Sequence, residues 1–502
     1  MSRAAAIARG LTVGYGYQAA VALTGLALTP FLLGRLGADD YGRWLIAGQL
    51  LAVLGLLDLG VTAVLPREVA RAAGAGASVA EVVRRARWLV WLQTPAVALV
   101  AAAAWWWAAD VRPELAGPLA VVLGGFVVQF PLRLPAAVLA GMQDLAYAGL
   151  VQAVGWAVTT AVSVALVLAG WGLNALAVGW AAGQLAGCAL AWRRVRERFP
   201  EVRAGWAWPG RAALLGQFGP GGWTSVRQLA QLLLNGADLV VLGLVAGPAA
   251  VVAYSCTVRL VGLVTNQPYL LATTALPALT ELQAGGDRGR LWRACRAVGT
   301  ATMVVSGGLA VAVLAVSPAF VPRWVGPEQY AGPAVVLGAV GVMVARHAAF
   351  TLLQTLFALG HDRRLAAAAV ADGVVTVGAT VAWVSVVGPV GVPLGSLTGL
   401  VLTNGAVAVW TLAGAEGVSA TRLVRAAAPW LVRFLVVVGP TAAAAFSPFA
   451  ADPAAAAALL LVGLVTYAGL VTPLFRRDPL AGYRDRFAAA VRRKLGLRPR
   501  TF

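Results

Sequence analysis

The chain has 502 residues, of which 60% are hydrophobic and only 12% are charged. A soluble protein carries about twice that charged fraction, and the spans of a membrane barrel would be runs of about 10 residues with alternating polarity. Apolar runs of about 20 residues recur instead from end to end, which indicates an all-α polytopic membrane protein. The net charge of +19 comes mostly from arginines in short loops, which favours anionic membrane lipids over nucleic acid as partners.

The first apolar run, residues 10–34, follows Arg3 and Arg9. It is too long for the apolar core of a signal peptide and more such runs follow, so we expect an uncleaved first span. The hydropathy of the whole chain predicts about 14 transmembrane helices. Their expected ranges are 10–34, 44–65, 88–109, 117–140, 148–169, 174–192, 212–245, 250–275, 297–318, 333–358, 365–387, 391–413, 434–451 and 454–475.

The expected span at 212–245 is too long for one straight helix. It contains the run Gly219, Pro220, Gly221 and Gly222, which should bend or break it. One interpretation is a gating hinge, since gating helices need residues that absorb a change of backbone conformation. The other is a static kink, which is common in membrane helices.

Charge predicts the orientation of these spans. Nearly all arginines outside the spans fall in loops on the side that holds the N-terminus, and the opposite loops carry only Arg35, Arg43, Arg112 and Arg323. By the positive-inside rule we expect both termini in the cytoplasm and the protein in the cytoplasmic membrane. Residues 476–502 combine arginines with apolar residues at helical spacing, which predicts a basic amphipathic helix on the inner leaflet. Binding of a partner protein is the alternative for this tail.

The chain also repeats itself weakly. Gly117-Pro118 and Gly332-Pro333 open matching spans, and Arg133 and Arg346 lie at matching positions within them, 213 residues apart. Such an offset covers six spans, so the halves share one orientation and imply a parallel pseudo-two-fold repeat with the substrate site between them. We expect an N-terminal six-helix bundle at 1–192, a basic cytoplasmic linker at 193–211, a C-terminal six-helix bundle at 212–413, two additional helices at 414–475 and the tail at 476–502.

Four arginines fall inside expected spans: Arg133, Arg227, Arg259 and Arg346. An arginine at the centre of a spanning helix costs roughly 2.5–3.5 kcal/mol on insertion scales, so these side chains should avoid lipid. A cationic lumen that receives an anionic substrate is the functional interpretation. The alternatives are buried ion pairs with Asp58, Asp238 or Asp372 and, for Arg259, a side chain that reaches to the interface.

Three acids and three amides complete the candidate set. Asp58, Asp238 and Asp372 lie in apolar runs and could serve either ion coupling or ion pairing. Ion pairing is favoured, because Asp58 and Asp238 lie off the span centres and Asp372 lies near a span end. Three amides of the span 212–245 share one helix face beside Arg227 and are the candidate glycan contacts, although amides also join membrane helices. They are Gln228, Gln231 and Asn235.

Several short segments resemble bacterial polysaccharide transporters of the O-antigen flippase type, within the multidrug/oligosaccharidyl-lipid/polysaccharide exporter superfamily. The N-terminal matches are Thr29-Pro30, Leu36-Gly37-Ala38-Asp39-Asp40-Tyr41-Gly42 and Leu56-Leu57-Asp58-Leu59-Gly60. The matches in the second half are Asp238, Leu242-Gly243, Tyr254 and Arg259-Leu260. The resemblance implies flipping of an undecaprenyl-diphosphate-linked oligosaccharide by alternating access between two bundles, alongside other polysaccharide-assembly proteins.

Other functions find less support. A lipid II flippase of the same superfamily is expected to carry arginines within its first two spans, whereas the first span here has none in its interior. A multidrug exporter would favour acids for its cationic cargo, and a glycan polymerase would need a large outer loop or catalytic acids. The sequence lacks a phosphate-binding loop, a metal-ligand pattern and a nucleophile–base pair, so it predicts a transporter rather than an enzyme, without metal or cofactor.

Overall fold

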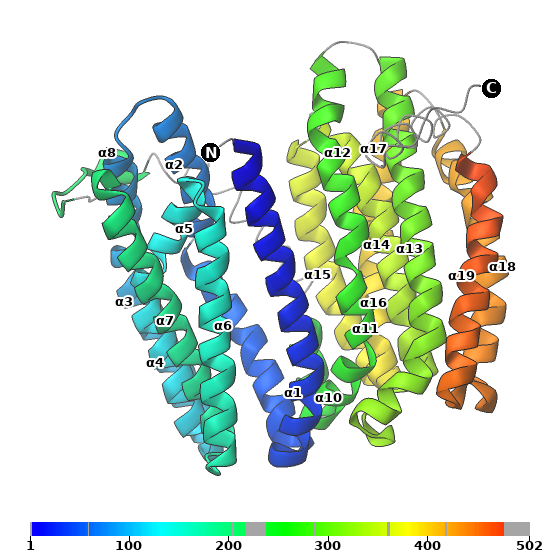
Figure 1. Cartoon of the computed structure of the whole chain (residues 1–502), viewed down its shortest axis with the longest axis horizontal. Helices are drawn as coiled ribbons and strands as arrows, with labels where there is room; N and C mark the ends of the chain where they lie inside the picture. The colour runs from blue at the N-terminus through cyan, green and yellow to red at the C-terminus, as the bar shows by residue number, and fades with distance from the viewer. Residues whose placement is uncertain are drawn as a thin grey trace. The chain divides into compact units, whose positions relative to one another are not determined.

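The computed structural model describes residues 3–58, 60–202, 205–215, 237–284, 288–358, 362–416 and 419–475. Over these residues the chain is a polytopic all-α membrane protein (Figure 1). It divides into two compact units, Met1–Gly243 and Leu244–Phe502. This boundary lies beyond the expected linker at 193–211, in which Val202 is buried in the core of the N-terminal unit.

The N-terminal unit consists of helices joined by short 3₁₀ turns. A left-handed glycine, Gly37 (φ 78°), kinks the first helix into two segments. The elements are α1 (Arg3–Leu54), η1 (Gly55–Asp58), α2 (Val61–Gly74), α3 (Val79–Val111), η2 (Pro113–Leu115), α4 (Ala116–Leu132), α5 (Leu134–Gly141), α6 (Leu145–Leu168), α7 (Leu173–Arg198), η3 (Pro200–Val202) and α8 (Arg211–Leu215).

The C-terminal unit has the same character. The short apolar helix Ala237–Ala246 contains the boundary between the units. The elements that follow it are α10 (Pro248–Thr257), α11 (Arg259–Val264), α12 (Asn266–Ala284), α13 (Arg288–Val325), η4 (Pro327–Gln329), α14 (Pro333–Ala358), α15 (Asp362–Val387), η5 (Gly388–Val390), α16 (Gly391–Leu400), the π-helical turn η6 (Val401–Gly405), α17 (Ala406–Glu416), α18 (Ala420–Ala445), η7 (Pro448–Ala451) and α19 (Pro453–Phe475).

Ten described helices are long and apolar enough to cross a membrane, or eleven when the bent pair at 248–273 counts as one span. The sequence predicts about 14. Two of the ten runs continue through a turn or kink. Gly16–Ala52 covers parts of two expected spans, and Arg364–Gly414 covers the expected spans 365–387 and 391–413 completely. The expected span at 212–245 lies largely outside the described residues, and the expected span at 44–65 is interrupted by η1.

One helix pair in each unit packs through a stripe of glycines. On α7, Gly179 and Gly183 face Ser163 and Thr159 of α6 so closely that a Cβ on either glycine would meet backbone. On α16, Gly391, Gly395 and Gly399 face α15 in the same way. Small residues let membrane helices approach backbone to backbone. Gly391, Gly395 and Gly399 each lie 212 residues after a glycine of α7, one residue fewer than the offset of 213 between Arg133 and Arg346.

This packing predicts the effect of adding one methyl group. A Cβ at position 395 would lie 2.2 Å from the Thr380 Oγ1 and 2.5 Å from the Thr380 Cα. Since the backbone must shift, we expect Gly395→Ala to lower stability by about 1–3 kcal/mol, measured as thermal unfolding of the purified chain in detergent. Gly378→Ala on α15 is the matched control, because nothing lies within 4 Å of its added Cβ. Equal unfolding temperatures for the two variants would contradict the tight α15–α16 contact.

The two additional helices of the expected architecture are α18 and α19, and they pack on α13 of the C-terminal unit. A buried hydrogen-bond chain joins the three helices. The Trp430 indole donates to the Tyr467 hydroxyl at 2.9 Å, and that hydroxyl donates to the Val304 carbonyl at 3.0 Å. The polar edges of both aromatic side chains are therefore satisfied inside an apolar core.

Candidate functional site

Arg133 lies at a break in a membrane helix of the N-terminal unit. Pro135 cannot donate a backbone hydrogen bond to the preceding turn, so α4 ends at Leu132 and α5 begins at Leu134 with Arg133 between them. The guanidinium lies over the Phe130 ring, 4.3 Å from its centroid. Only 18% of the Arg133 side chain is exposed, so its charge is largely removed from solvent.

The partner of Arg133 is Asp58, whose side chain is 4% exposed. The Arg133 Nη2 atom lies 3.1 Å from the Asp58 Oδ2 atom. The same carboxylate accepts the backbone N–H of Gly60 at 2.8 Å and that of Thr62 at 3.2 Å, and also the Thr62 hydroxyl. Asp58 therefore caps the first turn of α2 as well as pairing with Arg133. Of the two interpretations of Asp58, this geometry is that of an ion pair.

The N-terminal unit also contains buried polar atoms without a hydrogen-bond partner among the described residues. The Arg133 Nε, the Gln93 Oε1 and the Gln129 Oε1 are buried and have no hydrogen-bond partner among the described residues. Gln93 donates to the Asp58 carbonyl at 3.4 Å, and Gln129 donates to Gln184 at 3.1 Å. Buried groups of this kind are costly unless a water or a ligand binds them. The N-terminal unit thus has hydrogen-bonding capacity left beside a neutralised charge pair.

In the described part of the C-terminal unit, the candidate arginines Arg259 and Arg346 have no carboxylate partner. Arg259 begins α11 just after a break at Val258, where the bent pair of helices turns by 51°. Arg346 lies within the continuous helix α14, next to His347 in the sequence. Both side chains are half-buried. No salt bridge in the described part of the chain involves either guanidinium.

His347 holds the helix that carries Arg346. It is fully buried, and its Nδ1 lies 2.8 Å from the Ser306 hydroxyl of α13. Its Nε2 lies 2.9 Å from the Thr265 carbonyl, at the break between α11 and α12. The Tyr269 ring packs edge-on against the imidazole at 4.6 Å. The sequence pattern does not predict this role of His347, for which its position next to Arg346 is the available signal.

The other two candidate acids lie on separate helices. Asp372 on α15 is fully buried and accepts hydrogen bonds from the Asn404 amide at 2.7 Å and the Thr376 hydroxyl at 3.2 Å. Asn404 belongs to the π-helical turn η6, and such turns occur often at functional sites. Asp238 lies half-buried on the short helix Ala237–Ala246.

The remaining candidates lie outside the described residues. These are Arg227, Gln228, Gln231, Asn235, the hinge candidates Gly219, Pro220, Gly221 and Gly222, and the tail 476–502. Within the described residues, no group of three or more His, Cys, Asp and Glu could hold a metal ion. Each unit therefore has its own candidate residues: the Arg133–Asp58 pair in the N-terminal unit, and Arg259 and Arg346 in the C-terminal unit.

Solved structures share this fold. A multidrug resistance MATE family transporter of the MOP superfamily, in an inward-facing conformation, has a TM-score of 0.60 at 15% identity, over 77% of this chain and 92% of that chain. The lipid II flippase MurJ, in an inward closed conformation, has a TM-score of 0.65 at 9% identity, over 93% of this chain and 98% of that chain. A MOP superfamily transporter from Pyrococcus furiosus, whose description reports a reverse polarity of the binding pocket, has a TM-score of 0.52 at 15% identity, over 80% of this chain and 92% of that chain.

Identities this low establish the fold alone. No curated protein matches the sequence. Residues 80–330, half of the chain, match the sequence family described as "Polysaccharide biosynthesis protein". This match confirms the family predicted from the short segments in both halves, and the solved structures agree with it in fold. The chain belongs to the polysaccharide biosynthesis protein family, whose fold here is that of the MOP superfamily transporters.

Proposed function

We propose that the protein flips an undecaprenyl-diphosphate-linked oligosaccharide from the cytoplasmic to the outer leaflet by alternating access. The observation that carries this proposal is the presence of two half-buried arginines, Arg259 and Arg346, without a salt bridge in the described part of the apolar C-terminal unit. The Arg259 Nε and the Arg346 Nη2 are buried and lack hydrogen-bond partners there. A diphosphate would supply both the missing charge and the missing acceptors.

Charge also argues against the nearest rival. A cationic drug entering this unit would meet two uncompensated positive charges in surroundings of low dielectric constant, where repulsion is stronger than in water. The diphosphate of a lipid carrier experiences attraction from the same two groups. Arg133 and Arg227 complete the proposed cationic lumen. For Arg133 the substrate phosphate would share the guanidinium with Asp58.

The proposed cycle follows from this distribution of charge. The lumen captures the diphosphate from the cytoplasmic side, the polyprenyl tail stays in lipid, and Gln228, Gln231 and Asn235 contact the glycan. We place both termini in the cytoplasm and the basic loops against anionic lipids, following the positive-inside rule. Asp238 and Asp372 are the candidates for ion coupling, since Asp372 is fully buried and no salt bridge of the described residues includes it.

The test is transport in proteoliposomes that contain the purified full chain. We expect inward-to-outward movement of a fluorescent undecaprenyl-diphosphate oligosaccharide to be at least tenfold faster than in protein-free vesicles, and no accumulation of a cationic dye. Lipid II in a parallel arm distinguishes the two flippase substrates. Dye transport without oligosaccharide flipping would overturn the proposal in favour of a multidrug exporter. Collapse of a proton or sodium gradient in the same vesicles reports on ion coupling.

A further inference from the structure

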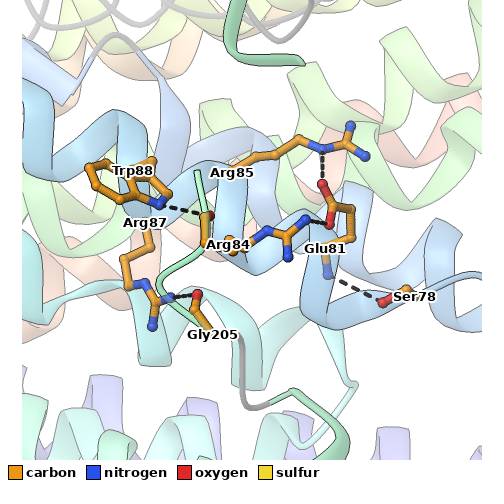
Figure 2. A network of polar contacts seen from close by, with 8 residues as sticks. Ser78, Glu81, Arg84, Arg85, Arg87, Trp88 and Gly205 are labelled. Atoms are coloured by element: carbon orange, nitrogen blue, oxygen red, sulfur yellow. Dashed lines mark hydrogen bonds and ion pairs between the residues drawn. The ribbon is translucent and has the colours of Figure 1, made fainter. Parts of the chain in front are cut away.

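A short segment between the two expected bundles is held against the beginning of α3 by aromatic and basic side chains (Figure 2). The Arg87 guanidinium donates to the Gly205 carbonyl, and the Trp88 indole donates to the Ala207 carbonyl at 3.2 Å. The Trp88 ring meets the Trp206 and Trp208 rings edge-on at 6.1 and 5.1 Å. We call Arg84, Arg87, Trp88, Trp91, Trp206 and Trp208 the tryptophan–arginine cluster.

The segment is fixed at both ends, yet its aromatic rings face outward. Val202 and Leu214 flank it and are buried in the core of the N-terminal unit, at 2% and 6% exposure. Trp206 and Trp208 between them are 58% and 51% exposed, and the neighbouring Trp91 is 44% exposed. Large aromatic side chains held this far into solvent are unfavourable unless something covers them.

The length of α3 places this surface at the edge of a bilayer. Trp88 and Trp91 lie near one end of the helix, and Trp105, Trp106 and Trp107 lie near the other. The 17 residues from Trp88 to Trp105 rise by about 25 Å in a helix, close to the roughly 30 Å of a hydrocarbon core. Tryptophan is enriched at both membrane–water interfaces for its combination of an apolar ring and a polar edge. The helix length therefore puts the cluster at the depth of the lipid headgroups.

Positive charge accompanies the rings. Glu81 pairs through its two oxygens with Arg84 and with Arg85, the latter at 3.1 Å. Arg87 stacks on Trp206, with its guanidinium carbon 4.1 Å from the ring centroid. No salt bridge of the described residues includes Arg87. This surface contains the guanidinium groups of Arg84, Arg85 and Arg87 and only the carboxylate of Glu81. It therefore keeps a positive charge beside the exposed tryptophan rings.

We propose that the tryptophan–arginine cluster binds the headgroup of an anionic phospholipid. The phosphate would bind to Arg87 and Arg84, and the exposed rings would pack beside the glycerol and upper acyl chains. An amphipathic ligand fits a surface that offers charge and apolar area together, which a free phosphate would use only in part. The inference rests on the proposed contact of the basic loops with anionic lipids and is independent of which cargo is flipped.

The experiment counts lipid bound to the full chain in detergent by native mass spectrometry, with phosphatidylglycerol as the probe. Phosphatidylcholine and inorganic phosphate are the comparison ligands. We expect the chain to bind one phosphatidylglycerol tightly, and the Arg87→Gln/Trp206→Ala variant to bind it about tenfold more weakly, since each basic residue near an anionic surface contributes severalfold. Both side chains are partly exposed, and unchanged thermal unfolding without lipid verifies the fold of the variant.

The control is Arg196→Gln/Trp192→Ala, which removes the same residue types from another cation–π pair, on α7, with a distance of 4.4 Å. This variant should bind phosphatidylglycerol as the parent does. Equal weakening in both variants, equal affinity for phosphatidylcholine, or full competition by inorganic phosphate would each overturn the proposal. Oligosaccharide flipping in vesicles lacking anionic lipid is scored separately, so failure of the lipid site and failure of the proposed transport are distinguishable.

Discussion

Replacing Arg346 by alanine is expected to slow oligosaccharide flipping by about 10- to 100-fold. A hydrogen bond to a charged group contributes roughly 1.5–3 kcal/mol, and each 1.4 kcal/mol corresponds to a factor of about ten. The flipping rate of Arg346→Lys should lie between those of the parent and of Arg346→Ala, because lysine keeps the charge but loses the planar guanidinium that binds two phosphate oxygens. The measurement is the initial flipping rate in proteoliposomes at low substrate concentration.

Stability separates this effect from misfolding. Since no salt bridge in the described residues includes Arg346, its removal leaves no buried carboxylate without a partner, and the unfolding temperature should change little. Arg323→Ala is the control, because Arg323 is exposed near the end of α13 and donates to the Ala319 carbonyl of its own helix at 3.1 Å. Flipping at the parental rate by Arg346→Ala, Arg259→Ala and the double variant would contradict the cationic lumen.

The membrane helices could be predicted from the sequence, because hydropathy and length dominate the free energy of an apolar segment in a bilayer. The number of separate helices was less predictable from the sequence. The kink at Gly37 and the interruption at Val258 depend on local backbone geometry, which hydropathy does not record. The glycine spacing of Gly391, Gly395 and Gly399 was available in the sequence, but the helix it packs against becomes clear only in the fold.

The candidate residues could likewise be predicted from the sequence only in part. The cost of a charge in a membrane identified Arg133, Arg259 and Arg346, since it depends on the residue and its segment alone. The pairing of Arg133 with Asp58, 75 residues earlier, stood only as an alternative, because a contact between distant residues depends on tertiary packing. The docked segment with Trp206 was expected to be a basic linker. Val202 and Leu214, apolar residues within or beside a polar stretch, were the signal that it packs on the bundle.

Removing Asp58 should be the most destabilising single change in the N-terminal unit. Asp58→Ala leaves Arg133 as an unpaired, largely buried cation, and breaking such a pair costs about 3–5 kcal/mol. It also removes the cap that satisfies two N–H groups at the beginning of α2, which costs roughly 1 kcal/mol more. Arg133→Met should cost less, because Asp58 keeps its backbone and hydroxyl donors. The check is thermal unfolding of the purified chain, monitored by loss of the monodisperse protein.

The double variant Asp58→Asn/Arg133→Met distinguishes a structural from a transport role of Arg133. With both charges removed, no ion remains unpaired, and the asparagine Oδ1 can still accept the Gly60 backbone N–H, so stability should recover above that of Asp58→Ala. If Arg133 contacts the substrate diphosphate, the double variant remains folded but flips slowly. Parental flipping by a stable double variant would restrict Arg133 to holding α2 against the break between α4 and α5, and would leave the transport charge to the C-terminal unit.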